Sequence, residues 1–506
     1  MKGYSSELLE QVEDILNIGI ALSMEKDRNR VLEMIVTEAR RITRADGGTL
    51  YLCDGKYLTF KIIQNETMQV FKGGKGEPID LPPVPMSRDN VSSYVALTKQ
   101  IVNIADVYYA EGFDFSGPKK YDQITGYRTA SMLVTPLENH VGEVIGVLQL
   151  INAQDDAGNP VPFADYYEKV ISCLSSQAAI SITNTQLVAD IEKLFNSFVE
   201  VMATAIDSRT PYNANHTRRV ALLAGQLARA VDETNEGPWA NETFPEERIT
   251  QLVMAGWLHD IGKIATPLAV MNKATRLEGR IELVMQRLDF IHSSLYSRYL
   301  EKKMGLLSTA RSNELDLLEK EWLESQAQVE RARQLILRVD NPATFVDEEI
   351  LKELKQIASL TYVDLHGQEL PWLSNDELQA LSVVKGTLTA EERRIMENHV
   401  LVTQRMLEKI PFTGKLAKVP YFASIHHEHL NGNGYLLGLK DRDIPLEGRI
   451  LALVDVFDAL TASDRPYKKE MPLEQALKIL RFMVQDGELD GPLLDIFIRA
   501  KVWEQI

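Results

Sequence analysis

The chain has few cysteines, lacks long apolar runs, and has fewer cations than anions. Only Cys53 and Cys173 carry thiols, and they stand far apart in the 506 residues. Two isolated thiols exclude a thiolate zinc site and indicate a reducing compartment. A transmembrane helix needs about 18 consecutive apolar residues, and no such run occurs. The sequence therefore predicts a cytoplasmic protein that does not enter a membrane.

Basic residues are also scarce relative to acidic ones. Asp and Glu total 72 against 55 Lys and Arg, which gives a formal net charge of -17. Such a surface repels polyanions, so the charge argues against a nucleic-acid polymer as partner. A small phosphate ligand must instead meet a locally basic pocket. At roughly 150 residues per domain, the chain length allows about three globular units.

The period of the apolar residues changes along the first part of the chain. Residues 6–45 have helical spacing, whereas residues 48–152 contain short β-type runs such as YLTFKII and EVIGVLQLI. This combination predicts an α+β domain over residues 1–185, in which helices accompany an antiparallel sheet.

A long helix is expected to follow this domain and to connect it to the rest of the chain over residues 186–208. From about Ala164 to Asp207 neither Gly nor Pro interrupts the sequence. Two interpretations stay open for it, a parallel dimer seam or a helix packed along its own domain. Both account for apolar residues that recur every three to four positions: Leu187, Ile191, Leu194, Phe198 and Met202.

The remaining chain, residues 209–506, has an almost wholly helical pattern and is predicted to be an all-α domain. Within it, residues 276–386 form a charged stretch without strand signals, which we interpret as a helical insertion. Such an insertion could cover a site, form a partner surface, or simply expose solvated helices.

Several histidines of this C-terminal half lie on faces that are otherwise apolar. They are His216, His259, His399, His426 and His427. A single inward histidine is usually a satisfied core residue. Burying five, with Asp260 and Asp455 in similar settings, would cost several kcal/mol without strong partners. Imidazole and carboxylate ligands without thiolate suit iron, manganese or zinc, so the pattern predicts a metal centre.

The adjacent pair His259-Asp260 indicates more than one ion. Neighbouring helical residues point about 100° apart, so the two side chains cannot chelate one ion as residues one turn apart do. They can address two ions side by side, with the carboxylate as a bridge. Two ions about 3.5–4 Å apart activate a water and stabilise an in-line displacement at phosphorus.

Five motifs, in this order, resemble those of the HD-GYP family within the HD superfamily. They are YNANHTRRV, WLHDIGKIATP, LTAEERRIMENHV, IHHEHLNGNGYLLGL and ILALVDVFDALTASDRPYK. The resemblance implies a metal-dependent phosphodiesterase that hydrolyses cyclic di-GMP to linear pGpG and/or GMP with two divalent ions, iron or manganese above other metals. Two alternatives remain, a catalytically weak cyclic-dinucleotide sensor or docking module, and a phosphohydrolase for another nucleotide.

The resemblance also implies a role for each matching residue. Asp260 would take part in catalysis, Lys263 would face a substrate phosphate or the attacking water, and Asp458 would orient a ligand. Tyr435 would line the substrate pocket, and Arg465 and Lys468 would hold phosphate. The implied metal ligands are His216, His259, Asp260, His399, His426, His427 and Asp455.

The motifs depart from the family pattern at several positions. Leu436 stands where the family has the proline of its GYP signature, and Asn431 stands where it has an acid. Some members have a Glu four residues before the first histidine, where it reaches a third metal. Here that position is Tyr212, so two metals are predicted rather than three.

The N-terminal region resembles a GAF sensor domain over about residues 15–185. The residues that carry this resemblance are TGYRTASMLVTPL and GEVIGVLQLINAQDDAGNPVPF. Members that bind cyclic nucleotides have Lys after a characteristic Asn, whereas here Asn152 precedes Ala153. The resemblance therefore implies a small-molecule ligand of another kind, or a purely dimerising role, with regulation of the C-terminal domain.

Overall fold

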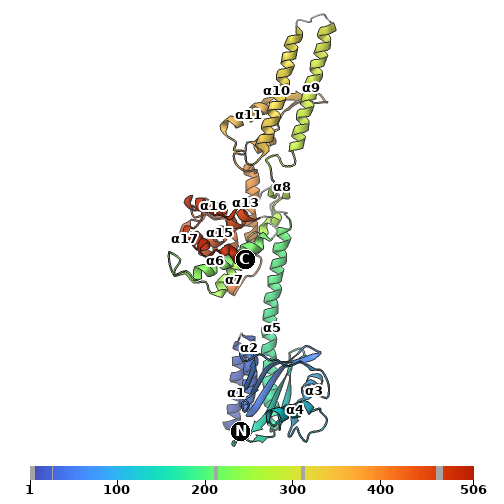
Figure 1. The fold of residues 1–506 in the computed structure, drawn as a ribbon, viewed down its shortest axis with the longest axis vertical. Coiled ribbons are helices and arrows are strands. Elements are labelled where there is room, and N and C mark those ends of the chain that lie inside the picture. Colours follow the sequence, from blue (N-terminus) through green and yellow to red (C-terminus); the bar gives the residue numbers. More distant parts are fainter. Residues whose placement is uncertain (1–5, 26, 210–214, 309–313, 463–470, 506) are drawn as a thin grey trace, which may run out of the picture. The chain divides into compact units, whose positions relative to one another are not determined.

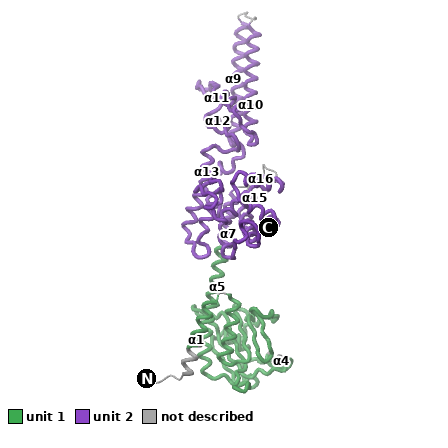
Figure 2. The backbone as a smooth tube through the Cα atoms, turned by 90° about the vertical axis from the view of Figure 1, so that its left-hand side faces the viewer, with its two compact units in different colours: residues 1–195 green, residues 196–506 purple. Residues whose placement is uncertain are grey.

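The protein forms two compact units, Met1–Phe195 and Asn196–Ile506, coloured separately in Figure 2. The computed structural model describes residues 6–25, 27–209, 215–308, 314–462 and 471–505. Within these ranges, no helix combines the length and the apolar character needed to cross a membrane.

The first unit is built on one antiparallel sheet. Its strand order is β3-β2-β1-β7-β6-β5, with β4 beside β2 and β8 beside β7. The four longest strands coincide with the predicted β-type runs, whereas the others are too short to show a period of two. The strands are β1 (Ala45–Cys53), β2 (Tyr57–Asn65), β3 (Val70–Gly73), β4 (Val84–Pro85), β5 (Val102–Ile104), β6 (Met132–Glu138), β7 (Val144–Gln154) and β8 (Pro160–Val161).

Helices cover both faces of this sheet (Figure 1). On one face lie α1 (Ser6–Met24), α2 (Arg28–Thr43) and the start of α5 (Tyr166–Asp207), and on the other lie α3 (Val91–Thr98) and α4 (Ser116–Thr125). Because successive strand residues face opposite ways, Leu50 enters the first core and Tyr51 the second. The predicted combination of an antiparallel sheet with helices is confirmed.

The predicted connecting helix is not a separate element. Residues 186–207 are the C-terminal part of α5, which runs for 42 residues without a break. Such a length agrees with the absence of Gly and Pro from its sequence.

The second unit is helical around the predicted site. Its first helix, α6, packs against α7 and α15, while α13 packs against the short η1 and α14. The elements are α6 (His216–Asp232), α7 (Glu246–Leu258), η1 (Ile261–Ala265), α8 (Leu268–Met271), α13 (Ala390–Leu407), η3 (Gly414–Leu416), α14 (Val419–Ser424), η4 (Asp441–Asp443), α15 (Leu446–Thr461), α16 (Leu473–Gln485), α17 (Gly491–Arg499) and η5 (Val502–Glu504).

The insertion has a hydrophobic core of its own. Figure 1 shows its two long helices as a hairpin. The structure also corrects one expectation, because the stretch contains a short antiparallel strand pair, β9 with β10. Three-residue strands are too short to show an alternating pattern. The elements are α9 (Ile281–Ser308), α10 (Leu315–Asp340), α11 (Glu348–Ser359), β9 (Thr361–Val363), β10 (Glu369–Pro371) and α12 (Asn375–Leu381).

Buried cations fix the two ends of the insertion. Arg276 is fully buried and donates hydrogen bonds to the carbonyls of Val339, Thr344 and Val383. Lys273 pairs with Glu392 at 2.7 Å, at the start of α13. Because Arg276 is held by hydrogen bonds and Lys273 by an ion pair, the insertion leaves and rejoins the domain at a defined place.

Candidate metal centre

Five segments of the second unit bring the predicted metal ligands together. His216 begins α6, His399 lies in α13 and Asp455 lies in α15. The pair His259-Asp260 follows α7, and the pair His426-His427 follows α14. The apolar faces of these helices pack together, so the polar side chains on those faces and just after the helix ends meet in the interior.

A close approach between η1 and α13 fixes the backbone next to the pair His259-Asp260. A Cβ at Gly262 would lie 1.9 Å from the carbonyl oxygen of His399 and 2.5 Å from the nitrogen of Thr403. Only glycine fits there, which explains its place in the HDIGK motif. The Thr403 hydroxyl accepts a hydrogen bond from the Gly262 amide at 2.9 Å and donates one to the His259 carbonyl at 3.0 Å.

Backbone carbonyls set the tautomer of three imidazoles. The Nδ1 atoms of His259, His399 and His426 lie 2.7, 2.6 and 2.8 Å from the carbonyl oxygens of the residues three positions before them. A carbonyl only accepts, so Nδ1 carries a proton and Nε2 is the ring atom left to bind a metal.

The Nε2 atoms of these three rings are buried and have no hydrogen-bond partner, and Asp260 Oδ1 shares this condition. The closest carboxylate oxygens lie 3.2 Å from Nε2 of His259 and 3.3 Å from Nε2 of His399, without hydrogen-bond geometry. Unpartnered buried polar atoms are costly, and a divalent cation satisfies lone pairs that converge in this way. The donor set therefore fits a metal.

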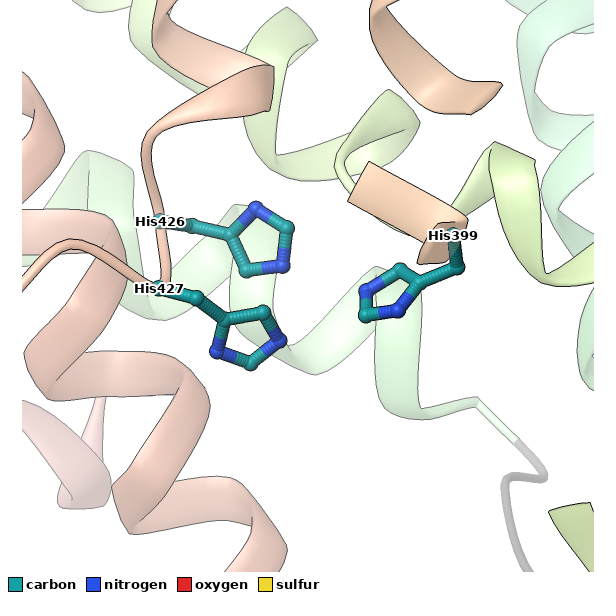
Figure 3. Close-up of side chains that lie close together, drawn as sticks. All are labelled: His399, His426 and His427. Carbon is teal, nitrogen blue, oxygen red and sulfur yellow. The ribbon is translucent and has the colours of Figure 1, made fainter. Parts of the chain in front are cut away.

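Two groups of donors can each hold an ion. His399, His426 and His427 form one group, drawn in Figure 3, and the other group is His216, His259 and Asp260. In each group the ligand atoms lie within 4.8 Å of one another.

Two carboxylates complete the arrangement. Asp260 reaches both groups, because its Oδ2 lies 3.2 Å from His259 Nε2 while its Oδ1 lies 3.3 Å from His399 Nε2. Asp455 Oδ1 lies 3.2 Å from His216 Nε2 and 3.6 Å from His259 Nε2. Asp260 thus has the geometry of a bridging ligand.

The two groups differ in electrostatics. Burial lowers the pKa of His259, but the carboxylates of Asp260 and Asp455 outweigh it and raise that pKa to about 9. His216 responds in the same way, and its pKa also rises. At His427 burial dominates and holds the pKa at about 3. The carboxylates therefore dominate the electrostatics around His216 and His259, whereas burial dominates at His427.

Arg219 and Asp458 hold His216 from behind. Asp458 Oδ2 accepts a hydrogen bond from His216 Nδ1 at 2.6 Å. The Arg219 guanidinium donates two hydrogen bonds to the same carboxylate, from Nε to Oδ1 at 2.6 Å and from Nη2 to Oδ2 at 3.1 Å. A carboxylate behind a ligating histidine fixes its tautomer and orientation. Sequence reasoning missed Arg219, although it lies one turn after His216 on the same helical face.

The last residue of α5 also supports His216. Asp207 accepts hydrogen bonds from the hydroxyl of Thr217, at 2.7 Å, and from its backbone N–H, at 3.3 Å. Burial raises the pKa of Asp207. The long helix thus ends on the neighbour of a predicted ligand, a contact that sequence reasoning did not foresee.

Lys263 lies at the edge of the centre, with Nζ 2.5 Å from Asp260 Oδ2. Burial lowers its pKa, but Asp260 and Asp455 raise it further, so the net shift is upward. The ammonium group therefore stays charged beside the site.

Tyr435 covers the imidazole side of the centre. Its ring lies on that of His427, with ring centroids 4.7 Å apart. The buried carboxylate of Glu428 fixes the following loop, accepting hydrogen bonds from the amides of Leu437, Gly438 and Leu439. Sequence reasoning missed Glu428. The Glu428 side chain thus fixes the loop after Tyr435, in which Leu436 replaces the proline of the family pattern.

Asn431 stands where the family pattern has an acid, and its amide side chain hydrogen-bonds within and beside its own loop. Its Nδ2 donates to the carbonyl of Asp486 at 3.0 Å, and its Oδ1 accepts from the amide of Asn433 at 2.9 Å. Three other predicted positions, Tyr212, Arg465 and Lys468, lie outside the described residues.

Family models match both units. The model of the GAF domain matches residues 27–182, and two models of the HD domain match residues 213–335 and 375–493. The chain therefore contains a GAF domain followed by an HD domain, as predicted.

Curated relatives match shorter stretches. A cyclic di-GMP phosphodiesterase of Thermotoga maritima is 38% identical over 119 residues, 23% of this chain and 31% of that protein. The 3'3'-cGAMP-specific phosphodiesterase 1 of Vibrio cholerae is 44% identical over 78 residues, 15% of this chain and 18% of that protein. The chain thus spans less than a third of the length of these relatives.

A solved GAF domain, from an Acinetobacter phosphoenolpyruvate-protein phosphotransferase, aligns with 36% of this chain and 98% of its own, at 17% identity and a TM-score of 0.27.

Proposed function

We propose that the chain is a metal-dependent phosphodiesterase that hydrolyses cyclic di-GMP, or a related cyclic dinucleotide, to a linear dinucleotide and/or mononucleotides. One observation carries the proposal: three imidazole Nε2 atoms and one Asp260 oxygen converge, buried and without hydrogen-bond partners. The names of relatives that act on cyclic di-GMP and on 3'3'-cGAMP support the substrate class.

Two divalent ions are proposed, with iron or manganese preferred because the donors are imidazoles and carboxylates. One would be held by His216, His259 and Asp455, the other by His399, His426 and His427, and Asp260 would serve both. Bound there, the ions would supply Lewis acidity and activate a water.

The side chains around these ligands have separate roles in the proposal. Asp458 keeps the His216 ring in the tautomer that exposes Nε2. Lys263 carries a positive charge beside Asp260, where it can neutralise charge on a phosphoryl oxygen. Tyr435 lines the substrate pocket, and Arg465 and Lys468 bind phosphate.

The remaining proposals concern partners and location. The GAF domain regulates the HD domain, binds a small molecule, and associates with a second copy through the connecting helix. The chain works in the cytoplasm. The boundaries proposed for its parts are residues 1–185, 186–208 and 209–506, with the insertion at 276–386.

Hydrolysis by reconstituted protein tests the activity. The purified chain is stripped with a chelator, reloaded with Fe(II) or Mn(II), and given cyclic di-GMP or 3'3'-cGAMP, and the products are identified by chromatography. We expect a linear product only after reloading. His259→Ala should abolish turnover, whereas His292→Ala should not, because that ring packs on Trp322 in the insertion.

Two results would contradict the proposal. Turnover by His259→Ala at the parent rate would show that the site is elsewhere. Stoichiometric metal and bound nucleotide without any product would favour the sensor alternative. Hydrolysis of 3'3'-cGAMP alone would retain the enzyme and change its substrate.

A further inference from the structure

Two side chains at the C-terminal end of α5 contact two different segments that carry predicted metal ligands. Asp207 accepts hydrogen bonds from Thr217, which is the neighbour of His216. Two residues further along the chain, the Arg209 guanidinium lies against the end of η1, the short helix that follows Asp260. The end of α5 therefore connects the segment of one predicted ligand to the segment of another.

Arg209 donates hydrogen bonds to three backbone carbonyls. Its Nη1 lies 2.9 Å from the carbonyl oxygen of Lys263 and also donates to that of Ile264, and its Nη2 lies 3.4 Å from that of Thr266. The last carbonyls of a helix have no partner within it and form the negative end of its dipole. Pro267, three residues after Ile264, has no N–H that could close the next turn. A planar guanidinium supplies both the missing donors and the matching charge.

The η1 helix is held on two sides. On one side the Gly262 amide donates to the Thr403 hydroxyl at 2.9 Å, which connects η1 to α13. On the other side Arg209 connects η1 to the end of α5, and Asp207 connects the end of α5 to the start of α6. The first connection reaches the helix of the three-imidazole donor group, and the second reaches the donor group that contains His216.

The donor group of His216, His259 and Asp260 depends on the distance between its two segments. His216 begins α6, whereas the other two donors follow α7. Its Nε2 lies 3.6 Å from Asp260 Oδ2. Imidazole and carboxylate donors bind a divalent ion at about 2.0–2.2 Å, so two atoms at this separation can share one ion. A displacement of about 0.5 Å in either segment is enough to weaken such a site.

We infer that Arg209 is a positioning residue of the metal centre, which holds η1 at the end of α5 and so fixes the distance between Asp260 and His216. Its hydrogen bonds go to backbone carbonyls, so it acts on the ligands through the position of η1. The inference rests on the two-metal centre of the proposed function. Its test reads metal affinity, which is measured without substrate.

Variants that keep one donor group test the inference. His399→Ala leaves the group that contains His216, and His216→Ala leaves the three-imidazole group, so each variant reports one ion. Competition between the metal-free protein and a fluorescent chelator for Mn(II) measures each affinity. Adding Arg209→Ala should weaken binding by about 10–100-fold in the His399→Ala chain and leave it unchanged in the His216→Ala chain. Arg209→Lys should lose less, because it keeps the charge without the guanidinium fork.

Ser208→Ala is the matched control for the end of α5. Its exposed hydroxyl donates to the carbonyl of Ala205 within the same helix, so this variant should change neither affinity. Thermal unfolding of each metal-free variant separates displaced ligands from lost folding, and Arg209→Lys gives the same comparison if Arg209→Ala does not fold. Equal losses of affinity in both chains, or no loss in either, would overturn the inference and leave the proposed function standing. A parent chain that binds no metal would overturn both.

Discussion

Each unit buries a polar cluster, and the two clusters differ in whether they are complete. In the GAF unit, the Asp46 carboxylate accepts from Tyr127 at 2.6 Å, and Asn152 donates to the same hydroxyl at 2.9 Å. The side-chain Oδ1 of Asn152 accepts a hydrogen bond from the backbone amide of Ala130 at 2.7 Å. In the metal centre, by contrast, the Nε2 atoms of His259, His399 and His426 have no hydrogen-bond partner.

Whether its polar atoms are paired indicates whether a buried polar cluster has a structural role or a functional one. A cluster whose polar atoms are all paired stabilises the fold and needs no ligand. A cluster with convergent unpaired atoms is complete only when something binds. Asn152 belongs to the first kind. Its side chain holds the backbone of Ala130 and Arg128, a structural role that requires no nucleotide.

The largest expected loss of activity follows from changing Asp260, the carboxylate proposed to bridge the two ions of the metal centre. Asp260→Asn keeps the shape of the side chain but loses the charge that faces both donor groups. Metal-ion catalysis supplies several kcal/mol, so turnover should fall by about 10³-fold or more. Metal content, measured by plasma mass spectrometry, should fall in parallel. Full metal occupancy with unchanged turnover would mean that Asp260 is not a ligand.

The complete cluster should respond in stability instead of activity. Asn152→Ala removes three hydrogen bonds and places alanine at a φ of 54°, in the left-handed region. We expect a loss of about 2–4 kcal/mol, because buried partners are left unpaired and the backbone is strained. Hydrogen exchange should locate the loss in residues 27–182, with metal content unchanged. Loss of metal in this variant would break the distinction between the two clusters.

The metal ligands could be predicted from the sequence because their residue types and their spacing along the helices indicate metal binding. His216, His399 and Asp455 are ligand types on inward helical faces, so their meeting could be predicted. The long strands β1 and β7 show their period, whereas the three-residue strand β5 does not. Which site residues work as proposed is still a prediction.

Supporting residues could not be found in this way, because their partners are remote in sequence. Arg219 meets Asp458 across 239 positions, and Thr403 meets Gly262 across 141. Arginine and threonine are common on solvated faces, so neither residue type signals a role. Glu428 is closer to its partners, but a loop glutamate gives no local sign that it binds backbone amides. Only the folded chain defines these contacts.

A smaller effect should follow when the support of a ligand is removed. Arg219→Ala leaves Asp458 without its clamp, so the His216 ring is held less firmly. Groups behind a ligand typically change metal affinity by about 10–100-fold. Arg229→Ala on the same helix is the matched control, since Arg229 pairs with exposed Glu246 at the surface. Competition with a fluorescent chelator measures both affinities. Equal affinities for the two variants would remove Arg219 from the centre.

The smallest effect is expected at the rim, where Tyr435 lies on His427. Tyr435→Phe keeps the ring contact, which is worth about 0.5–1.5 kcal/mol, so metal affinity should not change. If the hydroxyl binds substrate as proposed, KM should rise a few-fold while kcat stays close to the parent value. Tyr435→Ala should in addition weaken metal binding by up to about tenfold, because the ring no longer restrains His427. An unchanged KM in both variants would mean that Tyr435 only packs on His427 and does not bind substrate. The metal centre would then differ from the polar cluster of the GAF unit only in its unpaired ligand atoms.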